Sequence, residues 1–221
     1  MKKLRQILAP VLIFGMSFFV MQFATPAQAY VYNRSLAVNY AKNYSSNTTW
    51  ARNPSYVNLG ATDCTNFASQ VMLAGGMPQI TYGPLSGQWW YGISNSGAFS
   101  PSWSHVSDVY AFLMNSGRVN SVLYPSMSAK YSGASGGDIY LYDWGDGNGY
   151  SHVAVSTNSG NFANYYDPAA SQSYASVTGG SGDRTSQHSN DRVDAPWNWG
   201  WYVQPNPVFH SLARTKILHL Q

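Results

Sequence analysis

In the first half of the chain, apolar residues recur at the spacing of an α-helix. This spacing predicts three helices, over residues 33–45, 65–74 and 106–114. Gly75-Gly76 and then Pro78 follow the second of them, and such residues commonly end a helix. The next segment, up to residue 103, is rich in Gly, Pro, Ser and aromatic side chains. We expect residues 75–103 to form a long ordered loop.

In the second half, aromatic and β-branched residues indicate strands. Residues 139–142 and 151–156 flank a run of turn-forming residues, 143–149. The pattern predicts a hairpin. Because side chains alternate along a strand, His152 is expected on one face of the second strand and Val153 on the other.

The rest of this half is less regular. Residues 157–183 are expected to form loop and irregular strand, whereas 185–191 and 199–203 are predicted to be further strands. Helices that precede an antiparallel sheet along the chain are typical of an α+β domain.

The N-terminus has the composition of a secretory signal. A positively charged start precedes an almost wholly apolar run over residues 7–23, and Ala27-Gln28-Ala29 forms a small-x-small cleavage site. We therefore expect residues 1–29 to be removed, 30–207 to form one domain and 208–221 to form a C-terminal tail. The mature protein is predicted to be extracellular or held in the cell wall, without stable membrane insertion.

Charge and composition restrict the kinds of binding partner and cofactor that we expect. The chain carries 12 Lys and Arg against 9 Asp and Glu, but its signal segment is basic, so the remaining charges balance. Without a Lys/Arg cluster, nucleic acid is not an expected partner. Every acidic residue is an aspartate, which excludes the His-Glu-x-x-His zinc site. We expect a monomer that uses no metal and no other cofactor.

Cys64 is the single cysteine of the chain, so it has no internal disulfide partner. In an exported protein such a thiol pairs with another molecule, lies inert in a core, or acts as a nucleophile. Cys64 lies at the predicted start of the second helix, where unpaired N–H groups and the helix dipole stabilise a thiolate. This position and the polar neighbours of Cys64 favour the nucleophile over the inert thiol.

A nucleophilic cysteine needs a base, and histidine titrates near neutral pH. His152 is the best-placed of 5 histidines, because it stands at the head of a strand that would present it on one face. A strand histidine is more often structural, but the hairpin context around His152 favours a role in catalysis.

The chain resembles the putative amidase domain family, a secreted branch of the papain-like and NlpC/P60-like (CHAP-related) cysteine hydrolases. The resemblance covers most of the chain after the signal. The matching pieces are Tyr32-Asn33-Arg34, Asp63-Cys64-Thr65-Asn66-Phe67-Ala68-Ser69-Gln70, Gly75-Gly76, Trp89-Trp90-Tyr91, Ser102-Trp103, Gly137-Asp138, Ser151-His152-Val153, Gln187-His188-Ser189-Asn190-Asp191-Arg192 and Trp197.

The resemblance implies that Cys64 is the nucleophile and His152 its general base and acid. The third, orienting residue should follow on the next strand, where His188 matches first, Asn190 second and Asp191 third. A Gly/Ser/Tyr-rich insert over residues 159–183 separates this chain from compact relatives and leaves the three alternatives open.

Other candidate residues come from loops. Tyr56 could assist an oxyanion hole, and Trp89 and Trp90 could line a substrate groove or anchor the core. Asp143, together with Asp146 and Asn148, resembles part of a calcium loop, but the register and the terminal Glu of such loops are missing. A hairpin turn is the preferred interpretation there.

These observations predict a secreted cysteine amidase or peptidase that hydrolyses an amide bond in a cell-wall peptide or peptidoglycan. One alternative is a non-catalytic module that binds polymer through aromatic loops of the same fold. Another is a transglutaminase-like acyltransferase that uses the same Cys–His pair.

Overall fold

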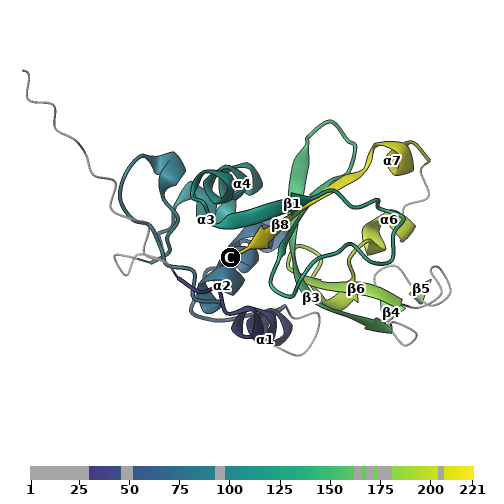
Figure 1. The fold of residues 1–221 in the computed structure, drawn as a ribbon, viewed down its shortest axis with the longest axis horizontal. Coiled ribbons are helices and arrows are strands. Elements are labelled where there is room, and N and C mark those ends of the chain that lie inside the picture. The colour runs from purple at the N-terminus through teal and green to yellow at the C-terminus, as the bar shows by residue number, and fades with distance from the viewer. Residues whose placement is uncertain are drawn as a thin grey trace, which may run out of the picture.

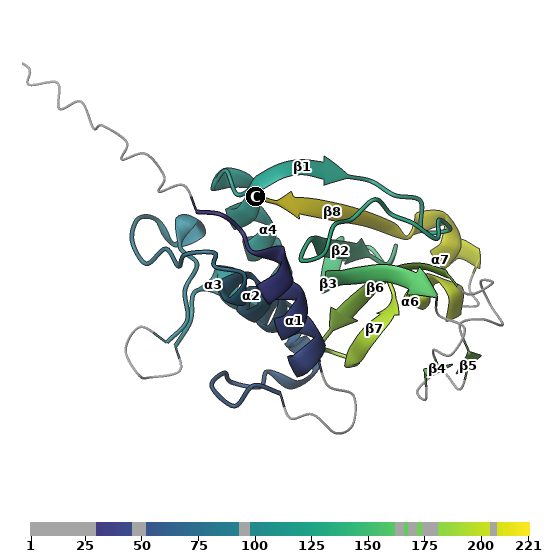
Figure 2. The ribbon, with the colours of Figure 1, turned by 60° about the horizontal axis from the view of Figure 1, so that its bottom comes forward.

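The chain forms a layer of helices packed on an antiparallel sheet, as the α+β prediction requires (Figure 1). The computed structural model describes residues 30–45, 52–92, 98–161, 166–167, 172–173, 181–203 and 207–221. Within these ranges, α1, α2 and α4 lie on one side of the sheet, whereas α6 and α7 lie at its far end (Figure 2).

The predicted helices are confirmed. The helical elements before the sheet are α1 (Arg34–Tyr44), η1 (Gly60–Thr62), α2 (Cys64–Ala74), η2 (Leu85–Gly87), α3 (Pro101–Ser104) and α4 (Val106–Asn115). The segment predicted as an ordered loop contains η2, α3 and two isolated bridges, Ile80 with Trp89 and Tyr91 with Phe99.

Helix α2 is the central helix, because every residue from Cys64 to Met72 is buried. It ends at two glycines, and each position requires glycine for a different structural reason. Gly76 adopts a φ of 89°, which favours glycine. A Cβ at Gly75 would lie 2.2 Å from Cε2 of Tyr32, so only glycine lets the Tyr32 ring pack here.

The main sheet has the strand order β1-β8-β2-β3-β6-β7 in the described residues, and all neighbouring pairs are antiparallel. Its strands are β1 (Val119–Leu123), β2 (Ile139–Asp143), β3 (Tyr150–Asn161), β6 (Ser181–Gln187), β7 (Arg192–Pro196) and β8 (Arg214–Leu220). Two short strands, β4 (Tyr166–Asp167) and β5 (Gln172–Ser173), pair with each other. The hairpin of β2 and β3 is the predicted one.

Strand β8 lies inside the sheet, between β1 and β2. The sequence pattern predicts a tail over residues 208–221, but these residues form most of helix α7 (Pro207–Leu212) and all of strand β8. Ile217 and Leu218 are both fully buried, on opposite faces of the sheet. A strand covered on both faces lacks the clean alternation of polar and apolar residues by which strands are usually identified.

Two predicted strands need correction. Residues 199–203 form helix α6 (Trp199–Val203) instead of a strand, and from this helix Trp199 is buried whereas Trp201 is only partly buried. Strand β6 ends at Gln187 instead of continuing to residue 191. Ser189 and Asn190 have φ values of 61° and 74°, and this left-handed backbone turns the chain out of the sheet.

The sheet is covered on both faces. On the helix side, Val153 and Val155 pack with Phe67 and Val71 of α2. On the other side, Tyr140, Tyr142 and Ala154 belong to a second cluster that includes Trp197. Among the described helices, none combines the length and apolar character needed to cross a bilayer.

Candidate active site

Cys64 is the first residue of helix α2, and only 5% of its surface is exposed. Burial is the largest single influence and raises the pKa of the Cys64 thiol, but the opposing contacts together, led by the hydrogen bond and charge of His152, bring that pKa below its usual value. The backbone N–H of Val153 and the hydroxyl of Thr65 act in the same direction. The site therefore favours the thiolate, the nucleophilic form of cysteine.

His152 comes to Cys64 from strand β3, where it pairs with Tyr142 of β2. Its ring centroid lies 5.8 Å from that of Tyr142 and 6.2 Å from that of Trp144. Nε2 of His152 is buried and has no hydrogen-bond partner in the described part of the chain. Such an atom is available to an orienting side chain, a water molecule or a substrate.

His152 also lines a cavity of about 430 Å³. The walls are mainly aromatic and polar, from Tyr142, Trp144, Asp146, His152, Gln187, Ser189, Asn190, Arg192, Pro196, Trp197, Trp199, Gly200 and Phe209. Asn190, the second choice for the orienting residue, therefore lines the same cavity as His152. Ser189 is there too, and its Oγ is buried without a partner in the described residues.

A second cavity, of about 700 Å³, lies near the junction of β8 with α7 and includes Tyr124, Trp201 and Lys216. Neither Cys64 nor His152 lines it. We place the candidate active site at the smaller cavity, because His152 lines it and also contacts the thiol of Cys64, although Cys64 itself is not part of the cavity wall.

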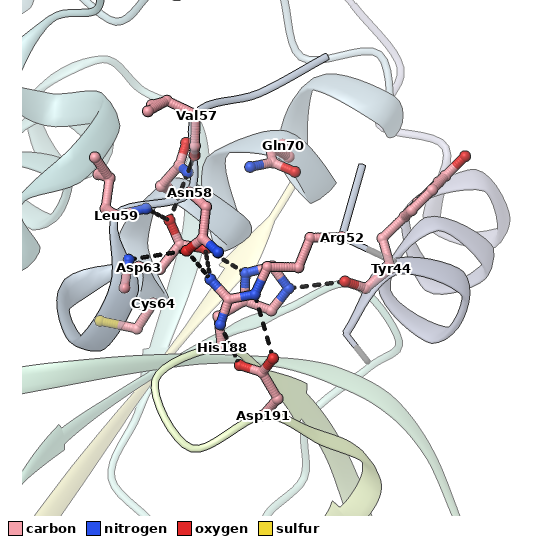
Figure 3. A network of polar contacts seen from close by, with 12 residues as sticks. Tyr44, Arg52, Val57, Asn58, Leu59, Asp63, Cys64, Gln70, His188 and Asp191 are labelled. Atoms are coloured by element: carbon pink, nitrogen blue, oxygen red, sulfur yellow. Dashed lines mark hydrogen bonds and ion pairs between the residues drawn. The ribbon is translucent and has the colours of Figure 1, made fainter. Parts of the chain in front are cut away.

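Asp63, the residue before Cys64, is buried in a dense set of donors (Figure 3). Oδ1 accepts hydrogen bonds from Leu59 N at 2.9 Å and Asn66 Nδ2 at 2.7 Å. Oδ2 accepts from Arg52 at 2.8 Å and contacts Nδ1 of His188. Burial raises the pKa of Asp63, but its hydrogen bonds, first that of His188, bring the pKa below its usual value. Asp63 is therefore a carboxylate.

His188 lies against Asp63, and its contacts do not fit the predicted role of orienting His152. Its Nδ1 binds Asp63, and its Nε2 lies 2.7 Å from the carbonyl oxygen of Tyr44. Because the carboxylate and the carbonyl can only accept, both nitrogens donate, and the ring is an imidazolium. The His188 ring also stacks on Phe67, with centroids 4.2 Å apart. Neither nitrogen remains for His152.

Asp191, the third alternative, is held by Arg52 instead. The guanidinium donates to both Asp191 oxygens, at 2.6 and 3.2 Å, and to Asp63 at 2.8 Å. Arg52 thus bridges two carboxylates across the gap between the loop before α2 and the turn after β6 (Figure 3). No motif in the sequence pointed to Arg52.

The residues proposed to bind substrate lie elsewhere. Trp89 is fully buried, with Nε1 donating to Ser69 at 3.0 Å, so it anchors the core and has no surface for a substrate. Trp90 donates to Gln88, and the Tyr56 ring packs 4.8 Å from that of Tyr91. None of the three lines the cavity of His152.

Trp144, Trp199 and Phe209 line that cavity, although sequence reasoning did not select them for substrate. Trp144 could have been found, because it follows Tyr142 by two positions and thereby continues the face of β2 that carries Tyr142. Trp199 and Phe209 were missed because their helices, α6 and α7, were not predicted.

The carboxylates of the β2–β3 turn bond to the turn itself. Asp143 accepts from the backbone N–H of Gly145 at 2.9 Å, and Asp146 accepts from the backbone and side chain of Asn148, both at 3.0 Å. These contacts are those of a hairpin turn. In the described ranges, no three His, Cys, Asp or Glu side chains gather as a metal site would require.

Comparison with known proteins assigns the chain to a family. A family model described as a putative amidase domain matches residues 31–210. The uncharacterized protein YhbB of Bacillus subtilis (strain 168) is 31% identical over 137 residues, which are 61% of this chain and 40% of the relative. The chain therefore spans about two fifths of the length of that curated relative. No solved structure matches this chain.

Proposed function

Because this chain belongs to the putative amidase domain family, we propose that it hydrolyses amide bonds by covalent catalysis, with Cys64 as nucleophile and His152 as general base and acid. The observation that carries the proposal is the contact between the two side chains, which lowers the pKa of the thiol despite its burial. A lowered thiol pKa at a helix start beside histidine is the usual state of a catalytic cysteine.

The chemistry proceeds in two steps. The Cys64 thiolate attacks the amide carbonyl carbon, and a C–S bond forms while the oxygen becomes an oxyanion. The first N–H groups of α2 have no partner within the helix, so the backbone N–H of Cys64 can stabilise this charge. The His152 imidazolium gives its proton to the leaving amine as the C–N bond breaks. Water, deprotonated by His152, then releases the acid and regenerates the thiolate.

We assign the orienting role to Asn190. It lines the same cavity as His152, whereas both nitrogens of His188 and both oxygens of Asp191 are already engaged. The Asn190 side chain can accept a hydrogen bond from the imidazole and thereby fix its tautomer. Ser189, whose hydroxyl has no partner within the described chain, would then bind substrate.

The proposed architecture is papain-like, in its NlpC/P60-like form, since a cysteine at a helix start meets a histidine on an antiparallel strand. The proposed substrate is a cell-wall peptide or an amide in peptidoglycan. Two features support it: the signal-like N-terminus, which indicates export, and the cavity wall of Trp144, Asn190 and Ser189, which suits a polar substrate of low charge.

Purified peptidoglycan tests this function. The wild-type protein should release new amino groups, measured by amine labelling and mass spectrometry of the fragments. Cys64→Ala should release none, and His152→Ala should be slower by about 10² to 10⁴. His105→Gln is the matched control, because His105 is exposed and lies outside the site.

The outcome also separates the alternatives. Binding of peptidoglycan without release of amines by any variant would identify a polymer-binding module. Incorporation of an added primary amine into the substrate, in preference to hydrolysis, would identify an acyltransferase with the same nucleophile.

Export has a separate test. N-terminal sequencing of material recovered outside the cells should begin at Tyr30, directly after Ala27-Gln28-Ala29. Recovery in the membrane fraction with Met1 retained would contradict export as a soluble protein.

A further inference from the structure

Two short stretches of chain contribute to the proposed site, one with the nucleophile Cys64 and one with the cavity-wall residues Ser189 and Asn190, and one contact joins them. Asp63 directly precedes Cys64 at the start of α2. His188 directly precedes Ser189 and Asn190, which line the cavity of His152. The contact between Asp63 and His188 spans 125 residues of sequence and is buried on both sides. Any displacement of one partner therefore moves a wall of the site relative to Cys64.

His188 to Asp191 form the turn after β6, and a second contact, between Arg52 and Asp191, fixes the far end of this turn. His188 opens the turn and is fixed by Asp63, while Asp191 closes it and is fixed by Arg52. Ser189 and Asn190, between them, have left-handed backbones at φ 61° and 74°. A non-glycine residue in this conformation is strained and persists only where its surroundings hold it. The bonds at both ends provide that support.

The four side chains of Arg52, Asp63, His188 and Asp191 carry balanced charges. Two cations, Arg52 and the His188 imidazolium, face two carboxylates, Asp63 and Asp191. Asp63 is 1% exposed, and two N–H groups, of Leu59 and Asn66, complete its hydrogen bonds. Loss of one cation would leave a buried carboxylate incompletely paired, which is far more costly than loss of a surface pair.

We propose that Arg52, Asp63, His188 and Asp191 form a positioning clamp that sets the distance between Cys64 and the wall that carries Asn190. This assignment rests on the proposed role of Cys64, and it makes His188 a positioning residue that acts through Asp63. His188 also holds the last residue of α1, since Nε2 donates to the carbonyl of Tyr44. The clamp thus ties α1, the start of α2 and the turn after β6 together.

The clamp acts through geometry, so its loss should appear in the reactivity of Cys64. A displacement of about 1 Å between reacting groups costs about 10²-fold in rate. If Asp63 shifts, the contact of Cys64 with His152 lengthens and the thiolate loses its main stabilising partner.

A double-mutant cycle on Asp63→Asn and His188→Ala tests the proposal. The measured quantity is the rate of Cys64 alkylation by iodoacetamide as a function of pH, in protein shown to be folded by near-UV circular dichroism. Each single variant should react about 10-fold more slowly at pH 7. The pH midpoint of each should lie above that of the wild type. The double variant should be no slower than the slower single one, because both changes break the same contact.

His188→Gln is the conservative variant, and it also covers the case in which His188→Ala does not fold. Its amide can still donate to Asp63, so the midpoint should return part of the way to the wild-type value. His105→Gln, on the exposed start of α4, should change neither the rate nor the midpoint.

Three results would overturn the clamp. The first is multiplication of the two single effects in the double variant, which would mean that His188 acts on His152 directly. The second is an unchanged midpoint in all folded variants with only a lower unfolding temperature, which would reduce the contact to a structural role. The third is a His188→Gln variant that folds but recovers nothing. Alkylation needs no amide substrate, so failure to hydrolyse peptidoglycan leaves this test intact.

Discussion

His152 contacts the thiol of Cys64 across the junction of strand β3 with helix α2, and this contact is the main influence that lowers the pKa of the buried thiol. The two residues come from elements far apart in the sequence, and they meet because α2 packs on β3, where the backbone N–H of Val153, the residue after His152, also reaches the thiol. The lowered pKa of Cys64 is a property of this pair, so it can be tested by changing either residue.

The first prediction concerns the pH dependence of Cys64. Alkylation of the folded protein by iodoacetamide should have its midpoint below about 8.5, the usual value for a free thiol. His152→Ala should move this midpoint upward, because burial then acts without the opposing imidazole. Intact mass after timed alkylation measures the rate, and urea-unfolded protein is the control with an ordinary midpoint.

The same pKa shift affects stability. Because the folded-state pKa of Cys64 is depressed, the resulting stabilisation is present above the unfolded thiol pKa of about 8.5 and is lost as pH falls through the folded-state pKa. Cys64→Ser should remove this dependence. Reaction of Cys64 only after unfolding would restore the inert buried thiol as the better interpretation.

The second prediction separates Asn190 from His188. Asn190→Ala should reduce kcat by about 100-fold. It should lower the unfolding temperature only slightly, because the Asn190 side chain is exposed on the cavity wall and the main cost is that Ala tolerates a φ of 74° less well than Asn. His188→Ala should lower the unfolding temperature as well, because it leaves the buried Asp63 short of a partner. Thermal unfolding and steady-state kinetics on one substrate at one pH measure both. A near-normal kcat for Asn190→Ala would remove it from the site.

The third prediction is that hydrolysis survives chelation. Asp143, Asp146 and Asn148 already bond to groups within the β2–β3 turn, so a calcium ion would have to displace these contacts. Activity before and after EDTA treatment and dialysis should agree. If calcium restored activity lost on chelation, Asp143 and Asp146 would be ligands and the turn would be a cation site.

The fourth prediction tests the end of α2. Gly75→Ala places a methyl group 2.2 Å from the Tyr32 ring, and overpacking of this kind costs about 1–3 kcal/mol. Gly87→Ala is a matched control, because a Cβ there meets no atom within 4 Å. Urea unfolding of the two variants measures the difference in the free energy of unfolding. Equal stability of both would show that Tyr32 moves aside at no cost.

Sequence reasoning located the cysteine helix and the histidine strand, because each carries a local signal. Cys64 stands before a helical apolar pattern that ends at two glycines, and His152 follows a run of turn residues. It did not locate the partner of His188, because ion pairing with Asp63 depends on how α2 meets β6 in space. No periodicity encodes a contact between residues 125 positions apart. Strand β8 was missed for a different reason, since burial on both faces removes the alternation.

The last prediction concerns that strand. A chain of residues 30–213 lacks β8 and should not fold, whereas residues 30–220 should fold like 30–221. Ile217, Leu218 and Leu220 are almost fully buried, and burial of such a side chain contributes about 1.5–3 kcal/mol. Their sum is comparable to the whole stability of a typical domain, about 5–15 kcal/mol.

Two polar contacts of β8 would be lost with it. Arg34 donates to the carbonyl of Leu220 at 2.5 Å, and His219 pairs with the buried Asp138. Removal of β8 would also leave β1 and β2 without their common neighbour. Far-UV circular dichroism and thermal unfolding of the three chains measure the outcome. A cooperative transition in residues 30–213 would show that the segment is a dispensable tail, as the sequence pattern alone indicated.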